Sequence, residues 1–166
     1  MRFVFLFLWV FPVFATAQTI QRDELDKYTK ARIKETSYET LSMKFAEAVA
    51  QRVKKVDSNI YLEIKLTLGP VYSITEGDLL YILLEKDESI PIPCARGGIA
   101  SGNHSRYGST YTGAYLYKLS GDQIEKLKKH NATGLRIGLA GEYVTFDKVK
   151  EKNALKLRKA LSLVTE

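Results

Sequence analysis

The feature that most constrains the fold is a strict alternation of apolar and polar residues in the middle of the chain. Residues 60–68 read Ile-Tyr-Leu-Glu-Ile-Lys-Leu-Thr-Leu, with an aliphatic residue at every second position. This period of two is typical of a β-strand with one buried face. The turn-forming residues Asp-Ser-Asn at 57–59 precede it, so residues 47–56 are predicted to complete an antiparallel hairpin. A helix over residues 41–56 remains the alternative, because apolar residues there also keep helical spacing.

The amino terminus has the three-part pattern of a cleavable signal peptide. Arg2 precedes an apolar run at 3–14, and the small residues Ala-Thr-Ala follow at 15–17. The apolar run is shorter than the roughly 20 residues that a membrane-spanning helix needs. We therefore expect residues 1–17 to be removed before Gln18 and the chain to be exported, to a periplasm or outside the cell. An uncleaved amphiphilic helix or a buried core segment is the alternative interpretation.

The remainder of the chain is long enough for one domain with a hydrophobic core. Residues 18–40 are polar and charged, and they are predicted to form a loosely docked leader or a short helix. Residues 41–166 are predicted to form a single α+β domain. Cys94 is the only cysteine, so no internal disulfide can form and core packing must stabilise the domain. For an exported chain, this cysteine usage favours a bacterial envelope.

Changes of pattern along the second half of the chain predict the remaining elements. Strands are expected at 79–84, 90–95, 114–119, 135–139 and 142–146, and helices at 121–129, capped by Ser120, and at 147–164. The apolar stripe of the last helix comprises Val149, Leu157, Leu161 and Val164. Pro91 and Pro93 would remove hydrogen-bond donors from one side of their strand, which is typical of an edge strand. The predicted fold class is α+β, a mainly antiparallel sheet with a short helix and a C-terminal amphipathic helix packed on one face.

Two passages in the last two thirds of the chain resemble a known group of proteins. They read Lys-Leu-Ser-Gly-Asp-Gln-Ile-Glu-Lys-Leu at 118–127 and Gly-Leu-Arg-Ile at 134–137. With the order of the strands around them, they are similar to small exported proteins of unknown function from Bacteroidetes. The resemblance implies an envelope location and a similar sheet-plus-helix fold. It implies no catalytic residue.

The residue types that usually carry catalysis are few and poorly spaced. The cysteine and histidine ligands available to a metal are Cys94, His104 and His130, whose spacings match no zinc pattern, and the acidic residues are too scattered for a calcium loop. Cys94 follows Pro93 in an apolar strand, so we expect a core residue rather than a nucleophile activated by His104. The glycine-rich run at 97–102 lacks the Lys and Ser/Thr of a phosphate-binding loop, and its glycines are expected to provide mobility. No catalytic residue, metal ligand or cofactor is therefore predicted.

The segment at 96–113 holds the candidate binding residues. It is rich in Gly, Ser, Thr and Tyr and is predicted to be a long, flexible loop. Loops often carry binding sites, and the side chains here could stack on a sugar ring or hold a carboxylate. A solvated hairpin end whose tyrosines cover the sheet edge is the alternative interpretation. The candidate residues are Arg96, His104, Arg106, Tyr107 and Tyr111.

Charge and location together limit the partners. The net charge of +6 indicates mild attraction to anionic molecules. Nucleic acid is not expected as a partner outside the cytoplasm, whereas proteins and glycans of the cell envelope are accessible there. The chain is therefore predicted to be a non-catalytic module that binds a protein or glycan partner through the 96–113 segment and the adjacent edge of the sheet. The sequence does not predict an oligomeric state.

Two other functions remain open as alternatives. The first is a small hydrolase that uses His104 or His130 as a base, which needs an acidic residue or a thiol beside the imidazole. The second is a peripheral protein held on anionic surfaces by the basic C-terminal helix. Membrane contact is not expected, because the apolar face of that helix is expected to pack against the sheet and complete the core.

Overall fold

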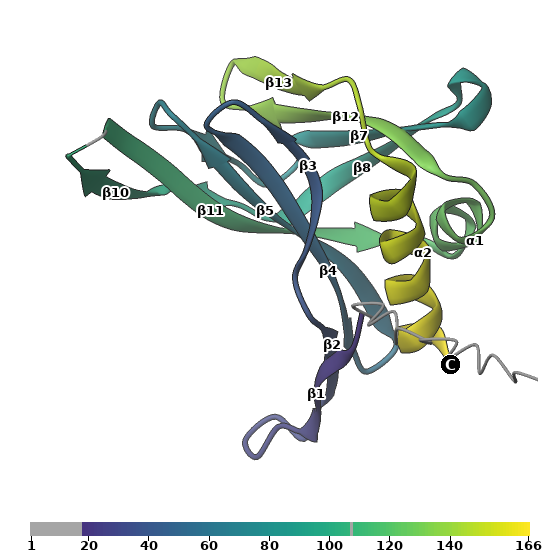
Figure 1. The fold of residues 1–166 in the computed structure, drawn as a ribbon. Helices are drawn as coiled ribbons and strands as arrows, with labels where there is room; N and C mark the ends of the chain where they lie inside the picture. The colour runs from purple at the N-terminus through teal and green to yellow at the C-terminus, as the bar shows by residue number, and fades with distance from the viewer. Residues whose placement is uncertain (1–17, 107) are drawn as a thin grey trace, which may run out of the picture.

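The fold is a mainly antiparallel sheet with a short helix and a C-terminal helix, as expected for the α+β class (Figure 1). The computed structural model describes residues 18–106 and 108–166, so the predicted signal peptide and Tyr107 lie outside the described residues. The helices are α1 (Gly121–Lys129) and α2 (Glu151–Thr165), and a short 3-10 turn covers Glu85–Asp87. The strands are β1 (Ile20–Leu25), β2 (Arg32–Thr36), β3 (Glu39–Lys44), β4 (Glu47–Val56), β5 (Asn59–Leu68), β6 (Ser73–Ile74), β7 (Leu79–Leu84), β8 (Ser89–Arg96), β9 (Gly98–Ile99), β10 (Ser101–Ser105), β11 (Gly108–Leu119), β12 (Ala132–Leu139) and β13 (Glu142–Phe146).

One long, curved sheet contains most of these strands. Its order is β1-β2-β4-β5-β11-β8-β7-β12-β13, with β3 paired to β4 and β10 paired to β11 outside this path. Contacts between β13 and β3 show that the sheet curls until its two halves approach each other, as Figure 1 shows. The curvature gives the sheet an inner face around the core and an outer face toward solvent.

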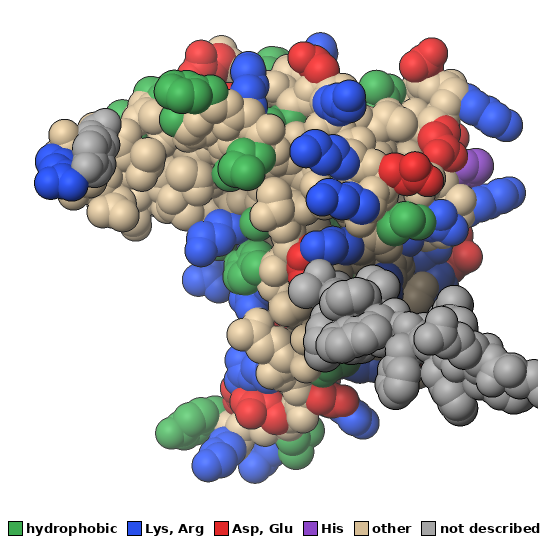
Figure 2. All heavy atoms as spheres, in the orientation of Figure 1, with side chains coloured by type: hydrophobic (Ala, Val, Ile, Leu, Met, Phe, Trp, Pro, Cys, Tyr) green, Lys and Arg blue, Asp and Glu red, His purple; other side chains and the backbone are tan. Residues whose placement is uncertain are grey.

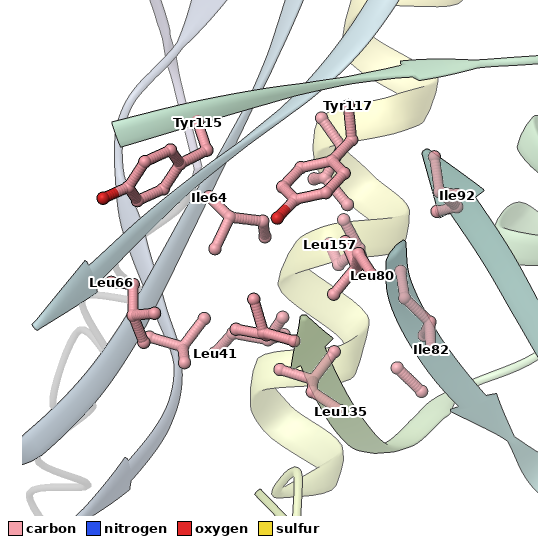
Figure 3. Close-up of a cluster of buried hydrophobic side chains, with 14 of the residues drawn as sticks. Leu41, Ile64, Leu66, Leu80, Ile82, Ile92, Tyr115, Tyr117, Leu135 and Leu157 are labelled. Carbon is pink, nitrogen blue, oxygen red and sulfur yellow. The ribbon is translucent and has the colours of Figure 1, made fainter. Parts of the chain in front are cut away.

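The inner face forms the hydrophobic core. The predicted hairpin of β4 with β5 is confirmed, and alternate residues of both strands point inward. In Figure 3, Ile64 of β5 and Tyr115 of β11 lie across the core from Leu80 of β7, with Leu157 of α2 between the strands. Cys94 is only 2% exposed and belongs to the same cluster, which confirms its expected place in the core. Each large aliphatic side chain buried here contributes about 1.5–3 kcal/mol.

Both helices begin and pack as their sequences indicate. The Gln123 N–H donates to Ser120 Oγ and the Ser120 N–H donates to Gln123 Oε1, so α1 starts in a capping box. Helix α2 contacts β2, β3, β4, β12 and α1. The predicted apolar stripe is confirmed as buried, although Val149 precedes the helix. The buried residues of α2 are Ala154, Leu157, Ala160, Leu161 and Val164.

The polar segment at 18–40 does not form the expected leader or short helix. It forms β1, β2 and the start of β3. Gln18 is 3% exposed and donates from Nε2 to Thr36 Oγ1 and to the Ser37 carbonyl, and Thr36 Oγ1 accepts from the Val53 N–H of β4. The expectation is wrong because it considered only the few apolar residues of this segment. The edge of β4 has otherwise unpaired backbone N–H and C=O groups, and the segment pairs with them as strands.

The 96–113 segment is not a long, flexible loop. Strands β9, β10 and β11 occupy most of it, and His104 pairs directly with Ser109 across the β10–β11 hairpin. Thr and Tyr residues favour pleated strands, and this preference outweighs the glycines. Gly97 has a packing role, since a Cβ there would lie 2.1 Å from the Ile74 carbonyl oxygen. The glycine permits the close approach that lets β9 pair with β6.

The prolines of β8 do not mark a sheet edge, because β8 lies between β7 and β11. The Cys94 N–H donates to the carbonyl just before β7, so by alternation Pro91 and Pro93 lack an N–H on the opposite side. On that side, β11 pairs with β8 only at Cys94 and Arg96, beyond the prolines. There the Pro91 carbonyl accepts from Gln123 Nε2 of α1.

The close approach at Gly97 generates a test of stability. We predict that Gly97→Ala lowers the free energy of unfolding by about 1–3 kcal/mol, because the methyl group would overlap the Ile74 carbonyl oxygen. The control is Gly98→Ala at the next residue, where an added Cβ meets nothing within 4 Å. Urea unfolding of both variants measures the difference. Equal stabilities would contradict the packing role of Gly97.

Candidate functional site

A β-bulge in β8 turns Arg96 toward the outer face of the sheet. Tyr117 of β11 pairs with Cys94, but its neighbour Leu116 pairs with Arg96, so Ala95 is an extra residue in β8. Without the bulge, Arg96 would share the inward direction of Cys94, two residues earlier. The bulge therefore places a guanidinium on the outer surface, at the point where β8 meets β11.

Arg96 lines a shallow groove on this outer face, which we call the basic groove. The groove holds three cationic side chains and no acidic one, and its volume is about 380 Å³. Tyr61 of β5 pairs with Lys54 on one side and Lys118 on the other, so these three residues form one row across the strands. Tyr61 and Leu116 provide an apolar surface between the cations. The lining residues are Lys54, Val56, Tyr61, Ala95, Arg96, Leu116 and Lys118.

One of these cations, Lys54, belongs to a network of ion pairs with buried carboxylates. Lys54 Nζ lies 2.8 Å from Glu35 Oε1, and Arg52 bridges Glu35 Oε2 and Glu63 Oε2 at 2.8 Å each. Glu35 and Glu63 are 5% and 8% exposed, so their charges need compensation, which Arg52 provides to both and Lys54 and Arg22 provide to Glu35 as well. Lys54 is consequently held by the network and contributes little free charge to the groove.

Tyr38 covers this network. Its hydroxyl donates to Glu63 Oε1 at 2.6 Å, and the Arg52 guanidinium lies 4.6 Å from the ring centroid. Burial, and then the hydrogen bond to Glu63, raise the pKa of Tyr38 well above its ordinary value. The hydroxyl therefore stays protonated and keeps donating to the carboxylate at physiological pH.

The available positive charge of the groove comes from Arg96 and Lys118. Among residues 18–106 and 108–166, no acidic side chain forms an ion pair with either of them. Both are exposed. An anionic ligand could therefore contact these cations without displacing an existing ion pair.

The other predicted binding residues do not line the basic groove with Arg96. Tyr111 lies five positions before the outward Leu116 on β11, so it faces inward, where it packs against the core. The His104 ring meets Tyr111 edge-on at 6.1 Å, and its Nδ1 lies 2.7 Å from Ser109 Oγ. Arg106 is exposed at the end of the β10–β11 hairpin, and Tyr107 lies outside the described residues. The four candidates that the structure describes therefore do not form a single site.

The chain offers little of what base or nucleophilic catalysis needs. In the described part of the chain, no carboxylate forms an ion pair with His104 or His130, so the His104–Ser109 pair lacks a third group to orient it. Burial raises the pKa of the Cys94 thiol, which keeps it protonated in the core. Within the same residues, no group of three His, Cys, Asp or Glu side chains is placed to hold a metal ion.

The basic C-terminal helix docks on the sheet. Lys156 pairs with Glu39 at 2.6 Å, and Arg158 donates to the Lys128 carbonyl, while Lys152 and Lys159 are exposed. Figure 2 shows Lys and Arg side chains following one another on the surface over α2. The apolar stripe is buried beneath them, so in this fold it is not free to enter a bilayer. Neither α1 nor α2 is long and apolar enough to span a membrane.

Three residues of the groove, Lys54, Tyr61 and Lys118, were not among the candidates predicted from the sequence. Each occupies an outward position of a strand, where a polar or amphipathic residue is ordinary. The alternation of 60–68 does mark Tyr61 as outward. The meeting of Tyr61 with Lys118, however, depends on the pairing of β5 with β11, which no local pattern reveals.

The ion-pair network generates a second prediction. We expect Arg52→Met to lower the free energy of unfolding by about 3–5 kcal/mol, because it removes the cation that pairs with the buried Glu63 and one of the cations beside Glu35. The control is Arg32→Met, since the Arg32 side chain is 73% exposed and its pair with Asp23 is solvated. Urea unfolding at neutral pH compares the two variants. Losses of similar size would contradict the central role of Arg52.

No protein-family model, no curated protein and no solved structure matches this chain.

Proposed function

We propose that the protein is an exported, non-catalytic binding module that holds an acidic glycan of the cell envelope in the basic groove. The observation that supports this most is the pair Arg96 and Lys118, which form no ion pair with an acidic side chain among the described residues. They flank the apolar surface of Tyr61 and Leu116. A ligand with both apolar and anionic parts fits such a surface.

Acidic sugars combine these two parts in one ring. The C–H groups of a sugar ring pack on aromatic and aliphatic side chains, here Tyr61 and Leu116. A carboxylate on the same ring can accept two parallel hydrogen bonds from the planar guanidinium of Arg96. Lys118 would act as a point charge for the same carboxylate or the next one along the polymer.

The proposal also needs the outer face of the sheet to stay open. We infer that both helices pack on the inner face, because α1 and α2 contact each other and contribute buried residues to the same core cluster. These residues include Leu127 of α1 and Leu157 of α2. The outer face would then carry the basic groove without a helical cover.

Export rests on the three-part pattern at the amino terminus, together with the resemblance to exported proteins. We predict that the protein purified from its own host begins at Gln18, and intact-mass spectrometry can check this. A mass that includes residues 1–17 would contradict cleavage, and residence in the cytoplasm would contradict the envelope ligand.

The basic groove can be tested by a binding experiment. We expect the protein to bind polygalacturonate, a polymer of carboxylated sugars, in isothermal titration calorimetry. Arg96→Glu or Lys118→Glu should weaken this binding about tenfold or more, because each removes a charge-assisted contact and adds a repulsion. The control is Lys159→Glu, which makes the same charge change on the exposed side of α2.

The outcomes separate the proposal from its alternatives. If polygalacturonate does not bind the unmodified protein, the acidic-glycan proposal is wrong. If Lys159→Glu weakens binding as much as Arg96→Glu, the attraction is general and the surface of α2 becomes the better candidate. Because exposed charges are screened by salt, binding that depends only on the lysines of α2 should weaken more in sodium chloride than binding that also packs a sugar ring on Tyr61 and Leu116.

A further inference from the structure

A second groove lies on the outer face near the other end of β8, and we call it the tyrosine groove. Its lining includes Tyr81, Ser89, Gly134, Arg136, Thr145 and Asp147, and its volume is about 560 Å³, within the roughly 300–1,000 Å³ of small-ligand sites. Ser89 is the first residue of β8 and Arg96 the last, so the two grooves lie about 23 Å apart along the strand.

The floor of the tyrosine groove is open because of a glycine. Arg136 of β12 pairs with Tyr81 of β7 and with Thr145 of β13, which makes one row across three strands. Gly134 lies two residues before Arg136 on the same face. Gly134 lines the groove, so a larger side chain at this position would occupy part of the space. A Cβ there would be in ordinary van der Waals contact, 3.4 Å from the Phe146 carbonyl oxygen. The space therefore depends on the absence of a side chain at this position.

The aromatic wall of the groove is held in place by its neighbours. The Tyr81 ring lies 6.5 Å from the Tyr143 ring in a tilted arrangement, and Pro91 pairs with Tyr81 from β8. A ring that is already positioned loses little conformational entropy when a ligand packs on it. The wall thus provides an apolar contact surface beside Tyr143 and Pro91.

The polar groups of the groove include both donors and acceptors. Arg136 has N–H donors, Asp147 has carboxylate acceptors, and the hydroxyls of Ser89 and Thr145 act as either. In the described part of the chain, neither Arg136 nor Asp147 forms an ion pair. One positive and one negative charge leave the groove near neutrality, which disfavours a polyanion and suits a ligand rich in hydroxyls.

We propose that the tyrosine groove binds a neutral sugar unit of a glycan. The sugar ring packs on Tyr81 above the open floor at Gly134. Its hydroxyls accept hydrogen bonds from Arg136 and donate them to Asp147. This site goes beyond the proposed function, because it shares no lining residue with the basic groove and does not require an acidic ligand.

The experiment titrates the isotope-labelled protein with neutral hexasaccharides of glucose, mannose and N-acetylglucosamine and follows backbone amides by NMR. We expect at least one of them to shift the amides of Gly134 and Arg136. Tyr81→Ala and Arg136→Gln should each weaken that binding about tenfold, and Gly134→Leu should abolish it by filling the floor. The control is Tyr28→Ala, which removes a 95% exposed ring from the β1–β2 turn.

Each outcome decides the proposal. Loss of binding in the groove variants, with Tyr28→Ala unchanged, supports it. No amide shift with any hexasaccharide at millimolar concentration overturns it, as does binding that Tyr81→Ala leaves intact or shifts confined to residues away from the groove. If Gly134→Leu fails to fold, Tyr81→Ala and Arg136→Gln still test the site, because both change outward side chains.

Polygalacturonate titration of the same variants keeps this proposal distinct from the proposed function. Tyr81→Ala should bind polygalacturonate like the unmodified protein, and Arg96→Glu should bind the neutral hexasaccharide normally. Failure of the acidic-glycan proposal would therefore leave the sugar site standing, and failure of the sugar site would leave the basic groove standing. Joint loss of both ligands in Tyr81→Ala would overturn the claim of a separate site.

Discussion

The pairing of β5 with β4 on one side and β11 on the other is the interaction on which the rest of the structure depends. The register brings Ile64 between Gln51 and Tyr115 on the inner face, and Tyr61 between Lys54 and Lys118 on the outer face. Because side chains alternate with a period of two, a slip of one residue would move the core side chains to solvent and the cations inward. The hydrophobic core and the basic groove are therefore fixed by the same hydrogen bonds.

The outer face is divided into two chemically different halves. On β2, β4 and β5, the carboxylates of Glu35 and Glu63 are used within a network that Arg52 holds together, so they do not reach the cations beyond it. The surplus positive charge accordingly appears where β11 meets β8. On β7, β12 and β13, glycine and uncharged residues occupy most outward positions, so the surface is hollowed rather than charged. One sheet thus presents two surfaces that suit different ligands.

Elements with a local signal could be predicted from the sequence. The turn at 57–59, the Ser120 cap and the tight turn between β12 and β13 all place their elements within a few residues of the observed bounds. The hairpins β1–β2 and β10–β11 could not be predicted in this way, because their stability comes from pairing with strands that are distant in the chain. Of the candidate site, Arg96 was identified, but its direction depends on a bulge, and its neighbours Lys118 and Tyr61 depend on strand order. The elements and residues that the sequence did not predict are therefore those that depend on pairing between strands distant in the chain.

Strand β8 contributes residues to both grooves and to the contact with α1. Pro91 and Pro93 lack the N–H groups that would let β11 continue its ladder along β8, so the two strands pair only at Cys94 and Arg96. The unpaired side of β8 is left to α1, whose Gln123 bonds to the Pro91 carbonyl. The bulge at the end of β8 then turns Arg96 outward, while Pro91 at the other end supports Tyr81. The two prolines thus limit the pairing of β8 with β11. The last residue of β8 lies in the basic groove, and its first residue lies in the tyrosine groove.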